Sequence, residues 1–352
     1  MDLINNVARR AGEWLRGVGP QHDIVISTRI RLARNIRGFY FLSRADGGMR
    51  AEICDTATRA IRKARGLGEF VHVDVEALEE LDRKLLVERQ LISRQQAEGD
   101  GARAVAFDPT EASSIMINEE DHLRIQVMRS GLQLDEAWEQ VNAIDDALDE
   151  RLDYAFHSQY GYLTACPTNV GTGIRVSMML HLPALRLTNE LERVAQAAKD
   201  LRLAIRGLYG EGTEALGDFF QISNQITLGR SEQEIINDLG REVIPKIVEY
   251  EKAARAALLK GRLSALDDKI FRAMGLLQSA RLISSNEAMQ CLSHVRMGVH
   301  VGRLKSIDLR TVNELFLQTQ PAHLQKLQGE RLNGEQRSVA RASLIRARLS
   351  NN

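Results

Sequence analysis

Cysteine is scarce in this chain, and its three cysteines form no metal-binding or disulfide pattern. Cys54, Cys166 and Cys291 are widely spaced, odd in number and without a CxxC pair. This usage fits a reducing compartment and argues against a structural zinc site. Residues 1–16 alternate acidic, basic and apolar side chains and lack the apolar core of a signal peptide. The sequence therefore predicts a cytoplasmic protein.

The sequence also lacks an excess of one charge and any long hydrophobic run. Its 47 lysines and arginines balance 47 aspartates and glutamates, so the formal net charge is zero. A general nucleic-acid-binding or membrane-binding surface is therefore not expected, and any phosphate binding must come from local clustering of cations. No apolar run approaches the length of a membrane span. A chain of 352 residues that is 44% hydrophobic is nevertheless long enough for two domains with a large core.

Neither common nucleotide-binding loop is present. The chain contains no Walker A loop and no GxGxxG motif, so neither motif can explain nucleotide binding here. A different glycine-rich loop follows a predicted strand at residues 207–214, and it carries carboxylates directly after Arg206.

The most unusual stretch runs from Cys166 to Arg175 and joins two apolar runs through a polar turn. One proline, one asparagine and two glycines within residues 167–173 predict a fixed bend with close backbone approach. Arg175 carries a planar, always-charged group that suits phosphate, and a cysteine beside cations is a candidate thiolate. The alternative is a glycine-rich connector in which Cys166 is simply a small buried hydrophobe.

Residues 23–35 begin as a predicted strand that places three polar side chains on one face. Alternation puts Ser27, Arg29 and Arg31 on the same side, opposite an isoleucine-rich face. Two arginines two residues apart are suited to one multiply charged anion, because each planar guanidinium can bind phosphate through two hydrogen bonds. Taken alone, a row of exposed charges on an edge strand explains the pattern equally well.

A strand predicted at residues 122–128 adds another arginine and a neighbouring carboxylate. Alternation places Arg124 on the same face as His122, opposite three apolar residues. The three consecutive acids at 119–121 would ordinarily form a solvated turn. Beside an anion-binding arginine, however, Glu120 is a candidate proton acceptor, whereas His122 is interpreted as a hydrogen-bonded structural residue.

Hydrophobic periodicity predicts alternating helices and strands in the first part of the chain and only helices beyond Leu258. Ser231 and Ser284, each followed three residues later by glutamate, are predicted helix N-caps. A domain boundary is expected within residues 250–262. Helices are predicted over residues 3–15, 49–65, 78–93, 132–152, 184–199 and 231–254, strands over 70–73, 103–107, 113–118, 202–206, 219–223 and 225–228, and a loop over 94–102.

Five arginines share one setting, on strands or strand ends next to polar turns. Each has an ordinary explanation as solvated charge when it is taken separately. Together they indicate a site in which guanidinium groups neutralise a triphosphate while carboxylates hold a cationic acceptor, as in-line phosphoryl transfer requires. The arginines are Arg29, Arg31, Arg124, Arg175 and Arg206, and the residues close to them in sequence are Glu120, Cys166 and Glu211.

Four segments resemble, in the right order, the signature segments of the phosphagen (guanidino) kinase family, and in detail its bacterial protein arginine kinase branch. They are STRIRLARN at 27–35, NEEDHLR at 118–124, CPTNVGTGIR at 166–175 and RGLYGEGTE at 206–214. The resemblance implies an α+β fold, with a phosphagen kinase/glutamine synthetase-like catalytic domain built on an eight-stranded antiparallel sheet flanked by helices. The expected division is an N-terminal helix and lead-in (1–23), the catalytic domain (24–255) and an all-helical C-terminal domain (256–352) for dimerisation or for binding substrate or phosphoarginine.

The resemblance also implies roles for individual residues. Mg-ATP would be bound by arginines, and its γ-phosphoryl group would pass to a guanidinium nitrogen. Glu120 would be the base, Glu211 would hold the guanidinium with it, and the Cys166 thiolate would tune the electrostatics of the substrate. No metal ligands are expected on the protein itself. The residues implied to line the nucleotide are Ser27, Thr28, Arg29, Ile30, Arg31, Arg124, Arg175, Val176, Ser177, Met178, Met179, Arg206, Gly207, Leu208, Tyr209, Gly210 and Glu211.

Two positions depart from the family pattern. Gln90 stands where related kinases commonly have a histidine on the adenine side, which predicts an altered nucleotide affinity. The C-terminal RDxxRA motif binds phosphoarginine allosterically in the protein arginine kinase branch, and it corresponds here to Arg337, Ser338, Arg341 and Ala342. An aspartate would pair with the guanidinium of a bound phosphoarginine, whereas Ser338 offers only a neutral hydrogen bond.

The resemblance predicts ATP-dependent phosphorylation of arginine side chains in proteins, which would mark them for Clp-type degradation under stress. Metabolic arginine and creatine kinases place a helical domain of about a hundred residues before the catalytic core, whereas the first nucleotide segment here begins at residue 27. An open site is therefore expected to accept arginine on a polypeptide. The expected partners are proteins with exposed arginines, an activator protein, the Clp machinery and a second copy of the chain. Two alternatives stay open, a small-molecule guanidino kinase and a non-catalytic phosphoarginine- or nucleotide-binding regulator.

Overall fold

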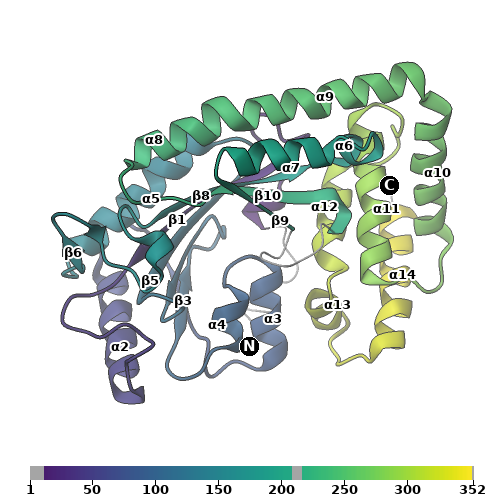
Figure 1. Ribbon diagram of the computed structural model, residues 1–352. Coiled ribbons are helices and arrows are strands. Elements are labelled where there is room, and N and C mark those ends of the chain that lie inside the picture. The colour runs from purple at the N-terminus through teal and green to yellow at the C-terminus, as the bar shows by residue number, and fades with distance from the viewer. Residues whose placement is uncertain (1–11, 208–215, 351–352) are drawn as a thin grey trace.

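An eight-stranded sheet forms the centre of the fold in the computed structural model, which describes residues 12–207 and 216–350 (Figure 1). All seven neighbouring pairs in this sheet are antiparallel. The eight-stranded antiparallel sheet that the resemblance implies is therefore confirmed. In spatial order its strands are β2 (Val71–Asp74), β3 (Ala104–Phe107), β4 (Ser113–Ile117), β5 (Leu123–Ser130), β1 (Val25–Arg34), β8 (Ile174–His181), β10 (Phe219–Asn224) and β9 (Leu203–Gly207).

Strand β1 lies between β5 and β8, and its register sets the position of the arginines. Arg31 stands opposite Gln126 on β5 and opposite Arg175 on β8, while Arg29 stands opposite Ser177. Directly opposite residues of antiparallel strands project to the same face of a sheet. The register therefore gathers polar side chains from three strands on one face.

The other face of the sheet is apolar and is covered by α5 (Leu134–Asp149). Ile30 and Leu32 are completely buried there. Arg34 projects to the same face and donates two hydrogen bonds of 3.1 Å and one of 2.6 Å to Asp145 of α5. Helix α5 is thereby fixed to β1 by both apolar packing and a buried ion pair.

Further helices and one small hairpin surround the sheet (Figure 1). The hairpin is β6 (Phe156–His157) with β7 (Gly161–Tyr162), and the short turns are η1 (Glu13–Leu15), η2 (Pro167–Asn169) and η3 (Leu216–Asp218). The helices are α2 (Gly47–Lys63), α3 (Glu80–Glu88), α4 (Arg94–Glu98), α6 (Pro183–Leu187), α7 (Leu191–Asp200), α8 (Glu232–Asn237), the π-helical η4 (Asp238–Val243) and α9 (Ile244–Gly261). None of the described helices combines the length and apolar composition needed to cross a membrane.

The C-terminal part is helical throughout its described residues, as the sequence predicts. It comprises α10 (Leu263–Ser279), α11 (Ser285–His300), α12 (Leu309–Gln318), α13 (Pro321–Gln328) and α14 (Gly334–Ser350), at the right of Figure 1. Helix α9 runs through the region in which the sequence places a domain boundary. The rings of Phe219 on β10 and Phe316 on α12 pack edge to face with centroids 4.8 Å apart. The helices therefore share a core with the sheet.

Several predicted helix boundaries differ from the structure. The helix expected at 184–199 is two helices, α6 and α7, because the backbone of Asn189 has a φ of 59° and interrupts the helical hydrogen bonding. The Ser231 capping box is confirmed, and Ser284 accepts from the backbone N–H of Glu287 as a simple N-cap. Most of the opening helix expected at 3–15 lies outside the described residues.

Two predictions for short segments are wrong. The loop expected at 94–102 contains α4, whose first turn is capped by the Ser93 side chain accepting from the backbone N–H of Gln96. The strand expected at 225–228 does not form, since β10 ends at Asn224. The Asn224 side chain instead donates to the carbonyls of Ile174 and Ile226, so the chain turns away from the sheet.

A buried carboxylate joins two of the helices that cover the sheet. Glu251 of α9 is completely buried and accepts hydrogen bonds from the backbone N–H groups of Ala184 and Leu185 at the start of α6, at 3.1 and 3.0 Å. It also accepts from Arg255 Nε at 2.8 Å. Burial raises the pKa of Glu251, and Arg255 opposes that shift.

We expect Glu251→Ala to destabilise the fold strongly, because it leaves two amides buried without their acceptor and leaves the buried Arg255 with its longer contacts to Asp23, at 3.3 and 3.4 Å. The free energy of unfolding should fall by about 3–5 kcal/mol, measured by urea denaturation. Glu249→Ala, at an exposed position on the same helix, should change it by less than about 0.5 kcal/mol. Equal effects of the two substitutions would contradict this structural role.

Candidate active site

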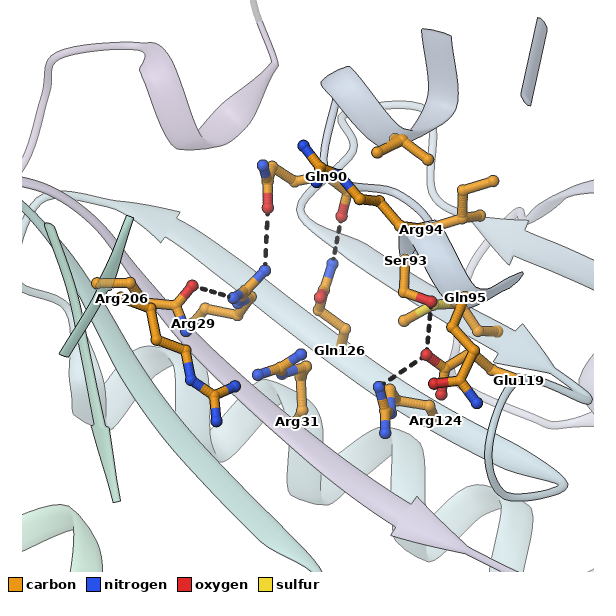
Figure 2. Close-up of a pocket in the computed structure, with 14 residues that line it drawn as sticks. Arg29, Arg31, Gln90, Ser93, Arg94, Gln95, Glu119, Arg124, Gln126 and Arg206 are labelled. Atoms are coloured by element: carbon orange, nitrogen blue, oxygen red, sulfur yellow. Dashed lines mark hydrogen bonds and ion pairs between the residues drawn. The ribbon is translucent and has the colours of Figure 1, made fainter. Parts of the chain in front are cut away.

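A cluster of arginines surrounds a pocket of about 340 Å³ on the polar face of the sheet. Figure 2 shows Arg29 and Arg31 of β1, Arg124 of β5 and Arg206 of β9 projecting into the same space. The arginines come from three strands that are distant in the sequence. The other residues that line this pocket are Val87, Gln90, Ile92, Ser93, Arg94, Gln95, Met116, Glu119, Gln126 and Gln221.

The cluster concentrates positive charge where water has limited access. Burial lowers the pKa of Arg29 to about 9, and Arg175 and Arg124 add to the effect. Burial and the neighbouring arginines lower the pKa of Arg31 well below its usual value, and Glu119 opposes the shift. The Nε atom of Arg31 is buried and has no hydrogen-bond partner among the described residues. A multiply charged anion would supply both the missing countercharge and the missing acceptor.

Neutral side chains hold Arg29 in place without cancelling its charge. Its Nη1 donates to Gln90 Oε1 at 3.1 Å (Figure 2), its Nη2 to Gln221 Oε1 at 2.6 Å and its Nε to Ser177 Oγ at 3.4 Å. The carbonyl of Gln90 in turn accepts from Gln126 Nε2 at 2.8 Å. Gln90 thus lies in the arginine pocket and orients one of its cations.

A second pocket, of about 460 Å³, adjoins the first and shares its arginines. Arg31, Arg124 and Arg206 line both pockets. Gln95 also lines both pockets, and the second pocket adds Glu120 and Cys166, together with Ala33, Thr168, Asn169, Gly173 and Arg175. A carboxylate and a thiol therefore stand at the far side of the same group of cations, where a second reactant can meet a bound anion.

Glu119 and Glu120 occupy different environments although they are adjacent. The Glu119 side chain is almost fully buried, where it accepts from Ser93 Oγ, from Arg124 Nη1 at 2.9 Å and from the backbone N–H of Glu120 at 2.8 Å. Glu120 is 30% exposed in the second pocket and accepts from Arg124 Nη2 at 3.0 Å. Burial raises the pKa of Glu120, while Arg124 lowers it. Glu120 is the one of the pair that is open to an incoming group.

The loop from Cys166 to Gly173 is the fixed bend that the sequence predicts. Gly171 has a φ of 112°, and a Cβ atom there would lie 2.8 Å from the carbonyl oxygen of Thr227. The Thr227 hydroxyl bonds the carbonyls of Thr168 and Val170 from the other side. Cys166 is half-buried, with its Sγ 2.9 Å from Thr168 Oγ1. The bend holds the thiol at the mouth of the second pocket.

The structure divides the predicted nucleotide residues between the two faces of the sheet. Ser27, Ser177 and Met179 line a small cavity beside Arg29, next to the arginine pocket. Leu208, Tyr209, Gly210 and Glu211 lie outside the described residues, whereas Gly207 ends β9. Four others alternate with the pocket residues along β1 and β8, so their side chains point into the core instead of the pocket. They are Thr28, Ile30, Val176 and Met178.

The C-terminal motif is engaged in structural contacts. Arg341 is 3% exposed and donates to the carbonyls of Thr319 and Ile283, at 2.7 and 3.0 Å. Ala342 is buried beside it. The Ser338 hydroxyl donates to a carbonyl of its own helix at 3.1 Å, and Arg337 donates to the carbonyl of Leu332. Arg341 thereby ties α14 to the end of α12.

Sequence reasoning missed the contacts that connect the helical part with the pocket. Glu88, at the end of α3, accepts from the backbone N–H groups of Ala322 and His323 at the start of α13 and bonds the His323 ring at 2.7 Å. The next residue, Arg89, is fully buried against Glu111 and His323. Gln90 follows directly. In the sequence, the only signal of these contacts was Glu88, which stands two residues before Gln90. Its partners in α13 lie more than 200 residues away along the chain.

Comparison with known proteins places these observations in a family. The profile of the ATP:guanido phosphotransferase C-terminal catalytic domain matches residues 52–254, and that of the protein-arginine kinase McsB C-terminal domain matches residues 254–352. A protein-arginine kinase of Symbiobacterium thermophilum is 49% identical over 347 residues, covering 98% of each chain. Another, of Halothermothrix orenii, is 44% identical over 349 residues, covering 99% of each chain.

Solved structures agree with this assignment. A lombricine kinase is 28% identical with a TM-score of 0.59, covering 70% of this chain and 72% of its own. A duplicated taurocyamine kinase from Schistosoma mansoni, with bound transition state analog components, is 27% identical with a TM-score of 0.61. The match covers 67% of this chain and 34% of that one. The eight-stranded sheet therefore has counterparts among guanidino kinases.

We expect Arg31→Met to weaken ATP binding and, at the same time, to stabilise the nucleotide-free protein. The substitution removes a cation that like charges surround, and it also removes charge-assisted hydrogen bonds to phosphate. Calorimetric titration should show a loss of about 10- to 100-fold in ATP affinity, while the melting temperature of the free protein rises.

Arg272→Met is the matched control, because this side chain on α10 is 79% exposed. It should change neither quantity. An Arg31→Met protein that binds ATP normally, or that melts at a lower temperature without nucleotide, would contradict the electrostatic account of the cluster.

Proposed function

The chain belongs to the ATP:guanido phosphotransferase family, and from this premise we propose that it is an ATP-dependent protein arginine kinase. The main support for the proposal is that two adjoining pockets share the same arginines, and that Glu120 and Cys166 line the second of them. The match of residues 254–352 to the C-terminal domain of protein-arginine kinases supports proteins as the substrates.

In this proposal the first pocket binds the triphosphate of ATP. The guanidinium groups of Arg29, Arg31, Arg124 and Arg206 replace the countercharge that water and ions give to phosphate in solution. Mg²⁺ bound to the nucleotide supplies further neutralisation of the phosphate oxygens. Neutral partners such as Gln90 and Gln221 keep Arg29 oriented without competing for its charge.

The second pocket takes the acceptor arginine side chain. A guanidinium is a poor nucleophile because its nitrogens share the positive charge, so catalysis needs a carboxylate that orients it and accepts its proton. We assign this role to Glu120, because it lines the second pocket and burial raises its pKa, which makes it a better proton acceptor than an ordinary glutamate. We assign the second carboxylate to Glu211, which lies outside the described residues, and we assign to Cys166 the tuning of the acceptor's charge.

Wider roles follow from the family assignment as proposals. We propose that the protein acts in the cytoplasm on proteins with exposed arginines, that an activator protein assists it, and that its products are marked for Clp-type degradation under stress. We also propose that it forms a homodimer. The extents assigned to the catalytic domain (24–255) and the helical domain (256–352) belong to the same proposal.

The direct test is incubation with ATP and either casein or free arginine, followed by mass spectrometry under conditions that preserve the acid-labile N–P bond. Phosphoarginine on casein is the expected result. Phosphorylation of free arginine alone would favour a small-molecule guanidino kinase. ATP binding without turnover, with an activator protein supplied, would favour a non-catalytic regulator.

We expect Glu120→Gln to abolish transfer while leaving ATP binding nearly intact. The amide keeps the size and one acceptor oxygen of the side chain but cannot take the guanidinium proton. Loss of a general base typically costs about 10²- to 10⁴-fold in rate, measured as phosphoarginine formed on casein. ATP affinity from calorimetric titration should not fall, since the removed charge is negative.

Glu119→Gln is the companion variant, because Glu119 matches the preceding position of the same acidic segment. Near-normal turnover by Glu120→Gln together with an inactive Glu119→Gln would show that the base is Glu119, and the roles assigned along this loop would shift by one residue.

A further inference from the structure

Gln90 has a backbone conformation that is costly for any residue with a side chain. Its φ is 64°, directly after the C-cap residue of α3. Its N–H donates to the carbonyl of Val87 at 2.9 Å, and the N–H of Leu91 donates to that of Leu86 at 3.0 Å, which completes a Schellman motif. Glycine is usual at this position, because it adopts a positive φ without strain. A glutamine held there is explained by its side chain, which accepts from Arg29 in the arginine pocket.

Arg89, the residue before Gln90, is completely buried and bonds a ring of the helical part. Its Nε and Nη2 donate to Glu111 at 2.8 and 2.6 Å, and its Nη1 donates to Nε2 of His323 at 3.2 Å. A guanidinium carries donors only, so Nε2 accepts and the ring proton lies on Nδ1. Burial lowers the pKa of His323, which keeps the ring neutral and this arrangement intact.

Glu88, one residue earlier, holds the same ring from its other nitrogen. Its carboxylate accepts from His323 Nδ1 at 2.7 Å and from the backbone N–H groups of Ala322 and His323, at 2.8 and 2.9 Å. Leu85 and Ala322 also pack together in a small buried cluster. Two consecutive residues of the segment that leads to Gln90 are therefore bonded to the first turn of α13.

These contacts fix the direction in which the Gln90 side chain leaves the end of α3. A residue with a strained backbone keeps its conformation only when its surroundings hold it. On one side, Gln126 Nε2 donates to the carbonyl of Gln90 at 2.8 Å. On the other side, the two preceding residues are held at α13 by charge-assisted hydrogen bonds. Without the His323 ring this segment gains freedom, and the acceptor that orients Arg29 moves with it.

We propose that His323 is a positioning residue for ATP binding, which acts on Arg29 through the segment that ends in Gln90. The inference rests on the proposed function, since it takes the arginine pocket as the site of the triphosphate. His323 is not among the residues that line either pocket, so it fixes the direction of a hydrogen bond and does not touch the substrate. The effect needs no ligand on the helical part and involves none of the C-terminal motif residues.

The test measures ATP affinity by calorimetric titration for His323→Leu, which removes both ring hydrogen bonds but keeps an apolar side chain in the core. We expect the Kd for ATP to rise about tenfold, while kcat at saturating ATP and the KM for casein stay unchanged. His323→Gln again supplies one donor and one acceptor and should recover most of the lost affinity. An equal loss in both variants would contradict the role of the ring's hydrogen bonds.

Arg331→Ala is the matched control, because it breaks another contact between α3 and the helical part. Arg331 forms an ion pair of 3.0 Å with Glu79, and the two side chains are 72% and 60% exposed. Glu79 stands at the opposite end of α3 from Gln90. This variant should leave the Kd for ATP unchanged, and a loss equal to that of His323→Leu would contradict the inference.

A double-mutant cycle separates positioning through Gln90 from a general loss of stability. In the Gln90→Ala protein the side chain that links the end of α3 to Arg29 is absent. Adding His323→Leu to that protein should therefore have little further effect on the Kd for ATP. A general structural effect would add in full, and that result would overturn the inference.

If His323→Leu shows no cooperative thermal unfolding, Glu88→Gln takes its place in the same cycle. It removes the charge that strengthens the hydrogen bonds to α13, and the additive or non-additive outcome decides as before. Failure of the wild-type protein to bind ATP would overturn the proposed function itself. Equal ATP binding by the wild type and by folded His323→Leu would overturn only the positioning role.

Discussion

Concentrated positive charge on one face of the central sheet is the constraint on which the rest of the site depends. The antiparallel register places Arg31 opposite Arg175, with Arg29 and Arg124 beside them. Such a group of cations repels itself unless something else holds the strands together. The opposite face provides that, since the same strands bury Ile30 and its neighbours under α5. The fold thus maintains a cluster of cations whose missing countercharge a bound anion would supply.

The polar residues around the cluster orient its cations without neutralising all of them. Gln90 and Gln221 accept from Arg29 as neutral groups, whereas Glu119 pairs with Arg124 and leaves Glu120 open to the second pocket. The position of Gln90 depends in turn on the helical part, because α3 ends in Glu88, which caps α13. The arginine pocket and the C-terminal helices are therefore parts of one connected structure.

The sequence could predict features that depend on local pattern or on a motif. The polar face of β1 follows from alternation and the bend at Cys166 from glycine content, and the resemblance supplied the sheet. His122 is hydrogen-bonded as expected, although its complete burial was not predicted. The sequence could not predict features that depend on contacts between residues far apart in the chain. The interruption at Asn189 depends on a positive φ at a non-glycine residue, and Gln221 gains its role only from a strand partner across the sheet.

Calorimetric titration of ATP, ADP and AMP under one set of conditions tests the central claim most directly. If the arginine cluster exists to bind polyphosphate, affinity must fall steeply with each phosphate removed, because each removal deletes charge-assisted hydrogen bonds. The account predicts that AMP binds weaker than ATP by at least about 100-fold. Equal affinities for AMP and ATP would contradict it, since binding would then come from the nucleoside and not from the cluster.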